Sequence, residues 1–188
     1  MFGRMASIVT FAVLTAAAPA VYADEYSDTV NLFKNAGKSD AFYKSAYGYA
    51  VFPNIGKGGV GIGGAYGKGR VYVKGKYIGN TSMTQVTVGL QLGGQAYSEM
   101  IFFEDERALK EFTSGNFEFG AEAGAIAITA SANASASTTG SSAGASGGKK
   151  DATTAGSYYK GMATFTVAKG GLMYEASVGG QKFKYKPR

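Results

Sequence analysis

Alternation of apolar and polar side chains runs through most of the chain after residue 47. It is clearest in residues 85–92, where the apolar positions are Val86, Val88, Leu90 and Leu92 and the intervening ones are Gln85, Thr87, Gly89 and Gln91. A period of two is typical of a half-buried strand. We therefore expect the valine and leucine side of this strand to face the core and the glutamine and threonine side to face solvent.

Similar strand patterns flank this segment. Residues 70–76 alternate in the same way, and Gly79-Asn80 follows as a predicted hairpin turn. Near the end of the chain, residues 164–168, 172–178 and 181–185 are separated by glycine-containing turns. The last of these strands should place Lys182, Lys184 and Lys186 on one face and Phe183 and Tyr185 on the other.

Helical periodicity is confined to two regions. In residues 24–46, Val30 and Phe33 share a helical face, and Ser39 or Asp40 can cap a second short helix carrying Phe42. Residues 104–113 begin with acidic side chains, as a helix N-terminus favours, and place Leu109 and Phe112 on one side. The predicted class is α+β: short N-terminal helices, a coiled, mostly antiparallel sheet that is barrel-like or sandwich-like, and one helix inserted at about 104–113.

The two remaining segments have their own composition. Residues 1–23 combine Arg4 with a short apolar stretch and end in Val21-Tyr22-Ala23, which predicts a signal peptide cleaved before Asp24. We expect an exported protein, in the periplasm and peripheral to a membrane, with residues 24–188 as a single domain. Residues 137–157 are almost entirely small and polar and predict a low-complexity loop in that domain.

The 188 residues include no cysteine and no histidine. Catalytic triads that use histidine, thiol nucleophiles and sites built from thiolate or imidazole ligands are therefore excluded. No spacing of carboxylates, lysines or serines marks a catalytic or metal site, and a Gly59–Gly64 stretch of dinucleotide-loop form lies in a strand-like context. We predict a protein that is not an enzyme, with no cofactor.

Charge is segregated along a chain whose net charge is +6. Residues 53–80 contain five basic side chains and no acid, and the last strand contains three more lysines. A solvated strand edge protected by lysine explains such positions equally well, but a basic surface also attracts anionic membrane. The predicted lipid-binding residues are Lys57, Lys68, Arg70, Lys74 and Lys76, followed by Lys182, Lys184 and Lys186.

Four motifs in a fixed order give a family resemblance. They are AYGYAVFP at 46–53, GGVGIGG at 58–64, GKGRV at 67–71 and VGLQLGG at 88–94. With them the sequence resembles the SYLF family of lipid-binding domains. The resemblance implies a lipid-binding fold: eukaryotic members associate with phosphoinositides and take part in actin-linked membrane traffic, and bacterial members are mostly exported proteins or lipoproteins. Asp24, Glu25 and Asp28 make the first helix a poor basic anchor for the bilayer.

The predicted function is binding of anionic phospholipid headgroups through a basic, glycine-rich sheet surface, with no nucleic-acid partner. The alternative is a structural envelope protein that self-associates without a lipid ligand, so oligomerisation stays open. A small outer-membrane protein of eight strands and an enzyme using carboxylate or lysine chemistry are further alternatives. The internal helix and the Lys186-Pro187-Arg188 terminus argue against the former, and no nameable constellation supports the latter.

Overall fold

The computed structural model describes residues 24–36, 38–88, 94–121, 123–128, 158, 160–169 and 178–188. Its helices are α1 (Glu25–Lys34), α2 (Lys38–Ser45) and α3 (Glu106–Phe112). Both predicted helical regions are thus confirmed. Asp105 caps α3, where its carboxylate accepts a hydrogen bond of 2.8 Å from the Ala108 amide.

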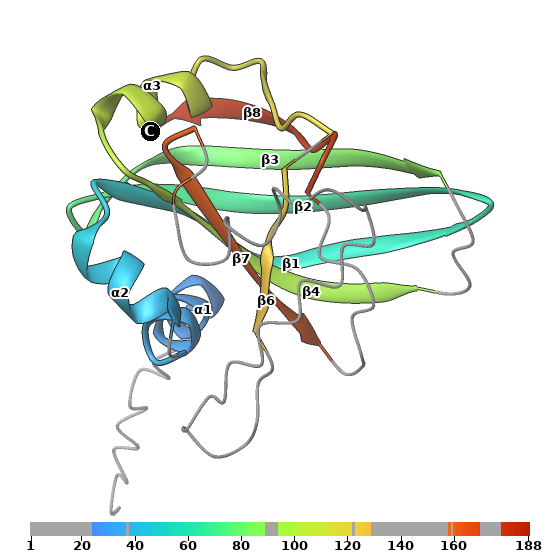
Figure 1. Cartoon of the computed structure of the whole chain (residues 1–188), viewed down its shortest axis with the longest axis horizontal. Helices are drawn as coiled ribbons and strands as arrows, with labels where there is room; N and C mark the ends of the chain where they lie inside the picture. Colours follow the sequence, from blue (N-terminus) through green and yellow to red (C-terminus); the bar gives the residue numbers. More distant parts are fainter. Residues whose placement is uncertain are drawn as a thin grey trace, which may run out of the picture.

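Eight strands form one sheet in the order β5-β8-β3-β2-β1-β4-β7-β6. All pairings are antiparallel except that of β6 with β7. The strands are β1 (Gly48–Val60), β2 (Ile62–Val73), β3 (Lys76–Val88), β4 (Gln95–Phe103), β5 (Phe117–Glu118), β6 (Ile126–Ile128), β7 (Met162–Lys169) and β8 (Lys182–Pro187). The sheet curls strongly (Figure 1), which confirms the α+β class and the barrel-like form.

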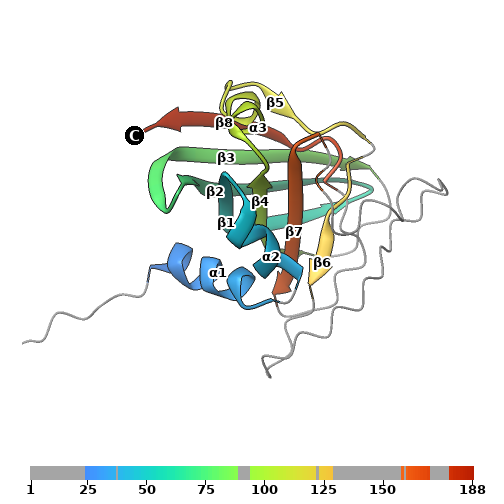
Figure 2. The ribbon, with the colours of Figure 1, turned by 60° about the vertical axis from the view of Figure 1, so that its left-hand side comes forward.

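The sheet separates two hydrophobic clusters. We call the concave side the inner face; its cluster includes Phe52, Ile55, Met83 and Phe183 and is covered by Phe112 of α3. The convex side is the outer face, where α1 and α2 pack over β1, β4 and β7 with a cluster that includes Phe33, Phe42, Val51, Met100, Phe102 and Phe165. The N-terminal helices and α3 accordingly lie on opposite sides of the sheet (Figure 2). Both sides of β4 are therefore buried.

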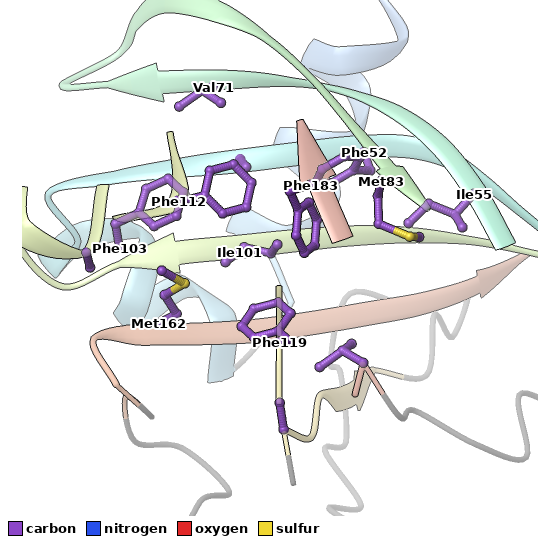
Figure 3. Packing of buried hydrophobic residues seen from close by; sticks show 14 of the residues in the cluster. Phe52, Ile55, Val71, Met83, Ile101, Phe103, Phe112, Phe119, Met162 and Phe183 are labelled. Carbon is purple, nitrogen blue, oxygen red and sulfur yellow. The ribbon is translucent and has the colours of Figure 1, made fainter. Parts of the chain in front are cut away.

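Phe183 of β8 lies at the centre of the inner cluster (Figure 3). Its ring centroid lies 4.9 Å from that of Phe112, 5.5 Å from that of Phe119 and 5.8 Å from that of Phe52. Tilted and edge-on rings at these separations attract one another in addition to burying apolar area. The predicted alternation of β8 is confirmed, since Phe183 is buried while Lys182, Lys184 and Lys186 are exposed.

The predicted hairpin turn at Gly79-Asn80 is wrong. The turn lies at Lys74 and Gly75, with φ of 49° and 76°, and two consecutive residues at positive φ are what a type I′ hairpin turn requires. Gly79 instead lies within β3 beneath the ring of Tyr185, whose atoms would come within 2.6 Å of a Cβ at that position. The glycine there makes room for an aromatic ring.

The predicted orientation of the strand at residues 85–92 is also wrong. Gln85 is buried and donates a hydrogen bond to the Gly179 carbonyl at 2.9 Å, whereas Val86 is 76% exposed. Register explains the reversal. Gln85 lies opposite Ala65 and Met83 opposite Gly67, so the odd-numbered residues of β3 follow the inner face of β2. Residues 89–93 lie outside the described residues.

Several other expectations fall outside the described part of the chain. The predicted signal peptide, 1–23, and the predicted low-complexity loop, 137–157, are not among the described residues. Of the strand expected at 172–178, only Val178 is described. Among the helices that the structure describes, none has the length and apolar character needed to cross a membrane.

Glycines in β2 allow close packing at the inner face. A Cβ at Gly69 would lie 2.7 Å from the Phe52 ring and 2.8 Å from the Val51 carbonyl oxygen. Because Phe52 is completely buried, its ring has little freedom to move aside. The glycine therefore lets the side chains of β1 lean across β2 where the sheet curls.

We predict that Gly69→Ala lowers the free energy of unfolding by roughly 1–3 kcal/mol, the usual cost of overpacking. Gly56→Ala is the matched control, because nothing lies within 4 Å of a Cβ at that exposed strand position, and it should be neutral or slightly stabilising. Urea unfolding of both variants measures the difference. Equal stabilities would contradict the packing argument.

Candidate functional site

A shallow groove of about 440 Å³ lies on the outer face where α1 leaves the sheet uncovered. Its walls come from α1, from the β2–β3 hairpin and from β8, three segments that are distant in sequence. Its lining side chains include Tyr26, Tyr66, Lys68, Ser82, Lys184 and Lys186. Two of the predicted basic segments, in β2 and β8, therefore meet in one groove.

Strand register brings these lysines together. Lys68 lies opposite Ser82, and Ser82 lies opposite Lys184. Residues directly opposite in an antiparallel pair share a face of the sheet, so Lys68 and Lys184 flank a small hydroxyl side chain on β3. One row further along, Lys186 lies opposite Asn80, which lies opposite Arg70.

Three ammonium groups of the groove are available to a ligand. Within the described part of the chain, no carboxylate lies within ion-pairing distance of Lys68, Lys184 or Lys186. Lys182 differs, because Glu118 approaches its ammonium to 3.7 Å. The middle of the groove thus carries concentrated positive charge that the described residues leave uncompensated.

Arg70 is already engaged by the start of α1. Its guanidinium pairs with the Asp24 carboxylate at 2.8 Å and lies 4.0 Å from the centre of the Tyr26 ring. Glu25 next to it accepts a hydrogen bond of 2.8 Å from Asn54. An acidic turn therefore closes one end of the groove, and Arg70 holds that turn in place.

The other predicted residues lie elsewhere. Lys57 is half-buried and lies opposite Ala65, a residue of the inner cluster, so it projects from the other face of the sheet. Lys74 lies in the β2–β3 turn and Lys76 directly after it, with Lys74 six residues or about 20 Å along the chain from Lys68. The eight predicted residues therefore do not form one patch.

Sequence reasoning missed some contributors to the groove. Tyr26 and Tyr66 supply its aromatic walls. Lys169 of β7 does not line the groove, but its ammonium lies on the same face and donates to the side-chain oxygen of Asn54, which lies opposite Lys68. A signal for Tyr66 was present, since it alternates with Lys68 and Arg70 along β2. Tyr26 carried no such signal, because the packing of α1 on the sheet determines its position.

A second polar cluster is buried at the inner face. Glu99 is completely buried, and its carboxylate accepts a hydrogen bond of 3.0 Å from the Gln181 amide. The same amide lies 3.4 Å from the Tyr97 hydroxyl, and Thr166 lies opposite Glu99 in the neighbouring strand. Among the described residues, no hydrogen-bond partner reaches Glu99 Oε1, Gln181 Oε1 or Thr166 Oγ1.

Burial raises the pKa of Glu99 to about 7, although the Gln181 hydrogen bond opposes the shift. Removal of the charged carboxylate from water is the larger effect. Burial also raises the pKa of Tyr97, and the neighbouring Glu99 adds to that rise. Glu99 is the only acid among the buried residues of the described chain, and the same residues contain no group of three or more acidic side chains placed to hold a metal ion. The cluster thus contains one carboxylate with amide and hydroxyl neighbours.

The fold and the groove together define a small α+β binding domain with a basic, aromatic-walled outer face. Residues 84–186, more than half of the chain, match the Ysc84 family, described as "Las17-binding protein actin regulator". The chain belongs to this family, whose domain is the SYLF domain, and the predicted resemblance is confirmed. The family is one of lipid-binding or actin-regulating domains and is known for binding rather than for catalysis.

One relative is Beta cell expansion factor A of Aeromonas veronii. It is 28% identical over 156 residues, which cover 82% of this chain and 51% of that protein. The chain thus spans about half the length of this relative.

Glu99 gives a pH-dependent prediction. Below about pH 4.5 the carboxyl is protonated in the folded and unfolded states, so it does not make stability depend on pH. Between about pH 4.5 and pH 7 only the unfolded state ionises, which lowers the free energy of unfolding by about 3 kcal/mol in total. The Glu99→Gln variant has no carboxyl to ionise at this position. The difference between its free energy of unfolding and that of the parent should therefore increase in favour of the variant from about pH 4.5 to pH 7 and then stay constant.

Urea unfolding at about pH 4, 6 and 8 measures the effect. Glu104→Gln, at an exposed position, is the control and should differ little from the parent protein at each pH. A pH-independent difference for Glu99→Gln would show that the carboxyl is not destabilised by burial.

Proposed function

We propose that this domain binds anionic phospholipid headgroups in the outer-face groove and acts as a binding protein, not as an enzyme. The observation that carries the proposal is the convergence of Lys68, Lys184 and Lys186 in one groove, with no described carboxylate pairing with them. Family membership supports a lipid-binding role in general. The groove adds a location and a charge preference to that role.

The composition of the groove suits a phosphate group at a lipid surface. Lysine ammonium groups on flexible stems bind phosphate as point charges. Tyr26 and Tyr66 flank them, and tyrosine combines an apolar ring with a polar tip, which suits the boundary between headgroups and water. Each lysine near an anionic surface contributes roughly 1 kcal/mol before screening by salt. Binding should therefore be reversible and salt-sensitive.

We predict that Lys68→Glu/Lys184→Glu weakens binding to anionic vesicles at least about 30-fold, from roughly 1 kcal/mol per lysine removed. Lys74→Glu/Lys76→Glu is the matched control, because it changes the net charge equally at the exposed β2–β3 turn. Co-sedimentation would compare vesicles of phosphatidylcholine with mixtures containing phosphatidylglycerol, at low and physiological salt.

The outcomes separate three interpretations. Loss of binding in the groove variant alone supports the proposal. Equal losses in both variants would mean that net charge, not the groove, governs attraction to the membrane. If the parent protein binds no vesicle but forms oligomers that depend on its concentration, the alternative of a self-associating envelope protein is favoured.

We further propose that the protein is exported and acts in the periplasm at a membrane surface. The signal-like composition of residues 1–23 supports this. So does the position of Asp24 directly after the predicted cleavage site, since its side chain already pairs with Arg70 in the fold.

Expression in a Gram-negative host followed by osmotic shock should release a chain that begins at Asp24. Intact mass and N-terminal sequencing measure the cleavage, and Ala23→Arg, which removes the small residue that signal peptidase requires, should block it. A full-length parent chain that stays in the cytoplasm would contradict the export proposal without affecting the binding proposal.

A further inference from the structure

Large apolar side chains are exposed mainly on one part of the outer face. Among the described residues they are Ile62 at 71% exposure, Val86 at 76%, Tyr66 at 51% and Leu32 at 39%. The first three lie on β2 and β3, and only Leu32 lies on a helix. Two well-exposed aliphatic side chains lie at one end of the sheet. Neighbouring exposed apolar side chains can mark a site of interaction with a protein or a membrane.

Strand register places these residues together. Val86 lies opposite Gly64, and Ile62 is two residues further along β2 on the same face. Such diagonal neighbours have Cα atoms about 7–8 Å apart, and Gly64 between them has no side chain to separate them. Ile62 directly follows Gly61, the positive-φ residue at the β1–β2 turn. The aliphatic pair thus lies beside the tip of a hairpin that extends beyond its neighbours (Figure 1).

Polarity changes steadily along the outer face of this hairpin. From the tip, successive outward positions of β2 are Ile62, Gly64, Tyr66, Lys68 and Arg70. The facing strands follow the same order, with Val86 opposite Gly64, and with Lys182 and Lys184 in the rows of Tyr66 and Lys68. Aliphatic, aromatic and cationic side chains therefore follow one another in the order in which a bilayer presents acyl chains, interface and phosphates.

We propose that the β1–β2 hairpin tip inserts Ile62 and Val86 into the acyl region of an anionic bilayer while the lysines of the groove contact the phosphates. The inference rests on the proposed lipid-binding function and adds the orientation of the bound domain. Six residues of strand separate Ile62 from Lys68, about 20 Å. A moderate tilt of the sheet suffices to place the tip about 5–10 Å below the groove, the depth typical of interfacial insertion.

The acidic start of α1 makes the hairpin a better insertion element than the N-terminus. Asp24 and Glu25 are bonded to Arg70 and Asn54 of the sheet, and their carboxylates would oppose entry into an anionic surface. The hairpin tip carries no acid, since residues 58–67 are glycine, valine, isoleucine, alanine and tyrosine. Lys57, one row further from the tip than Val86, projects from the other face, so insertion as far as Val86 brings no charged side chain of residues 58–67 into the acyl region.

The chain has no tryptophan, so one introduced tryptophan reports a single position. Ile62→Trp and the control Leu32→Trp would be mixed with vesicles of phosphatidylcholine and phosphatidylglycerol, with and without lipids brominated on the acyl chains. We expect a blue shift and bromine quenching for Trp at position 62 and neither for Trp at position 32, because α1 lies away from the hairpin tip (Figures 1 and 2).

Unlabelled variants give an independent readout. Ile62→Ser should weaken vesicle binding about tenfold, as expected for incomplete burial of one aliphatic side chain, and Leu32→Ser should not. The ratio of the vesicle affinity of the parent to that of Ile62→Ser should be the same at low and at high salt, because salt does not screen the burial of apolar surface. Soluble glycerol-phosphate should compete equally with both variants, since it reaches only the lysines.

The results separate this inference from the proposed function. Vesicle binding that requires Lys68 and Lys184, without quenching at position 62 and without loss in Ile62→Ser, would overturn the insertion and leave headgroup binding intact. If the parent protein binds no anionic vesicle, both proposals fail. Quenching at positions 62 and 32 alike would also overturn the proposed orientation.

Discussion

Burial of Phe183 is the interaction on which the basic groove of the outer face depends. The ring of Phe183 packs among Phe52, Phe112 and Phe119 on the inner face. Because neighbouring residues of a strand point to opposite faces, this burial directs Lys182 and Lys184 outward. Antiparallel pairing with β3 then places Lys184 in the row of Lys68. The basic groove is thus a geometric consequence of a hydrophobic contact on the other side of the sheet.

The two faces of the sheet differ in how completely they are covered. The inner face is closed by α3 and aromatic rings, and it tolerates one carboxyl, Glu99, whose burial favours the neutral form. Among the described residues, α1 and α2 cover the outer face mainly over β1, β4 and β7. The part over β2, β3 and β8 remains exposed, and there the charge of the lysines stays hydrated and available. Incomplete helical cover is therefore what leaves room for a binding surface.

The acidic first turn of α1 links these regions. Asp24 neutralises Arg70, while Tyr26 forms one wall of the groove. The same turn thus removes one cation from the surface and shapes the space beside three others. Family membership indicates binding in general, and the charge at the proposed site depends on how this turn docks on the sheet.

The sequence by itself determined the α+β class, both helical regions, the alternation of Phe183 with its lysines and the candidate cations, because these follow from local periodicity. It placed at Gly79-Asn80 the hairpin turn that lies at Lys74-Gly75. It also predicted that Val86 faces the core and Gln85 faces solvent, whereas the reverse holds, because either face of a strand with glycine neighbours can pack inward. Only the tertiary structure decided that Lys68 and Lys184 share a groove, that Arg70 is paired with Asp24, and that Lys57 projects from the other face. Those outcomes depend on register and on the docking of α1, which arise from contacts between residues far apart in the chain.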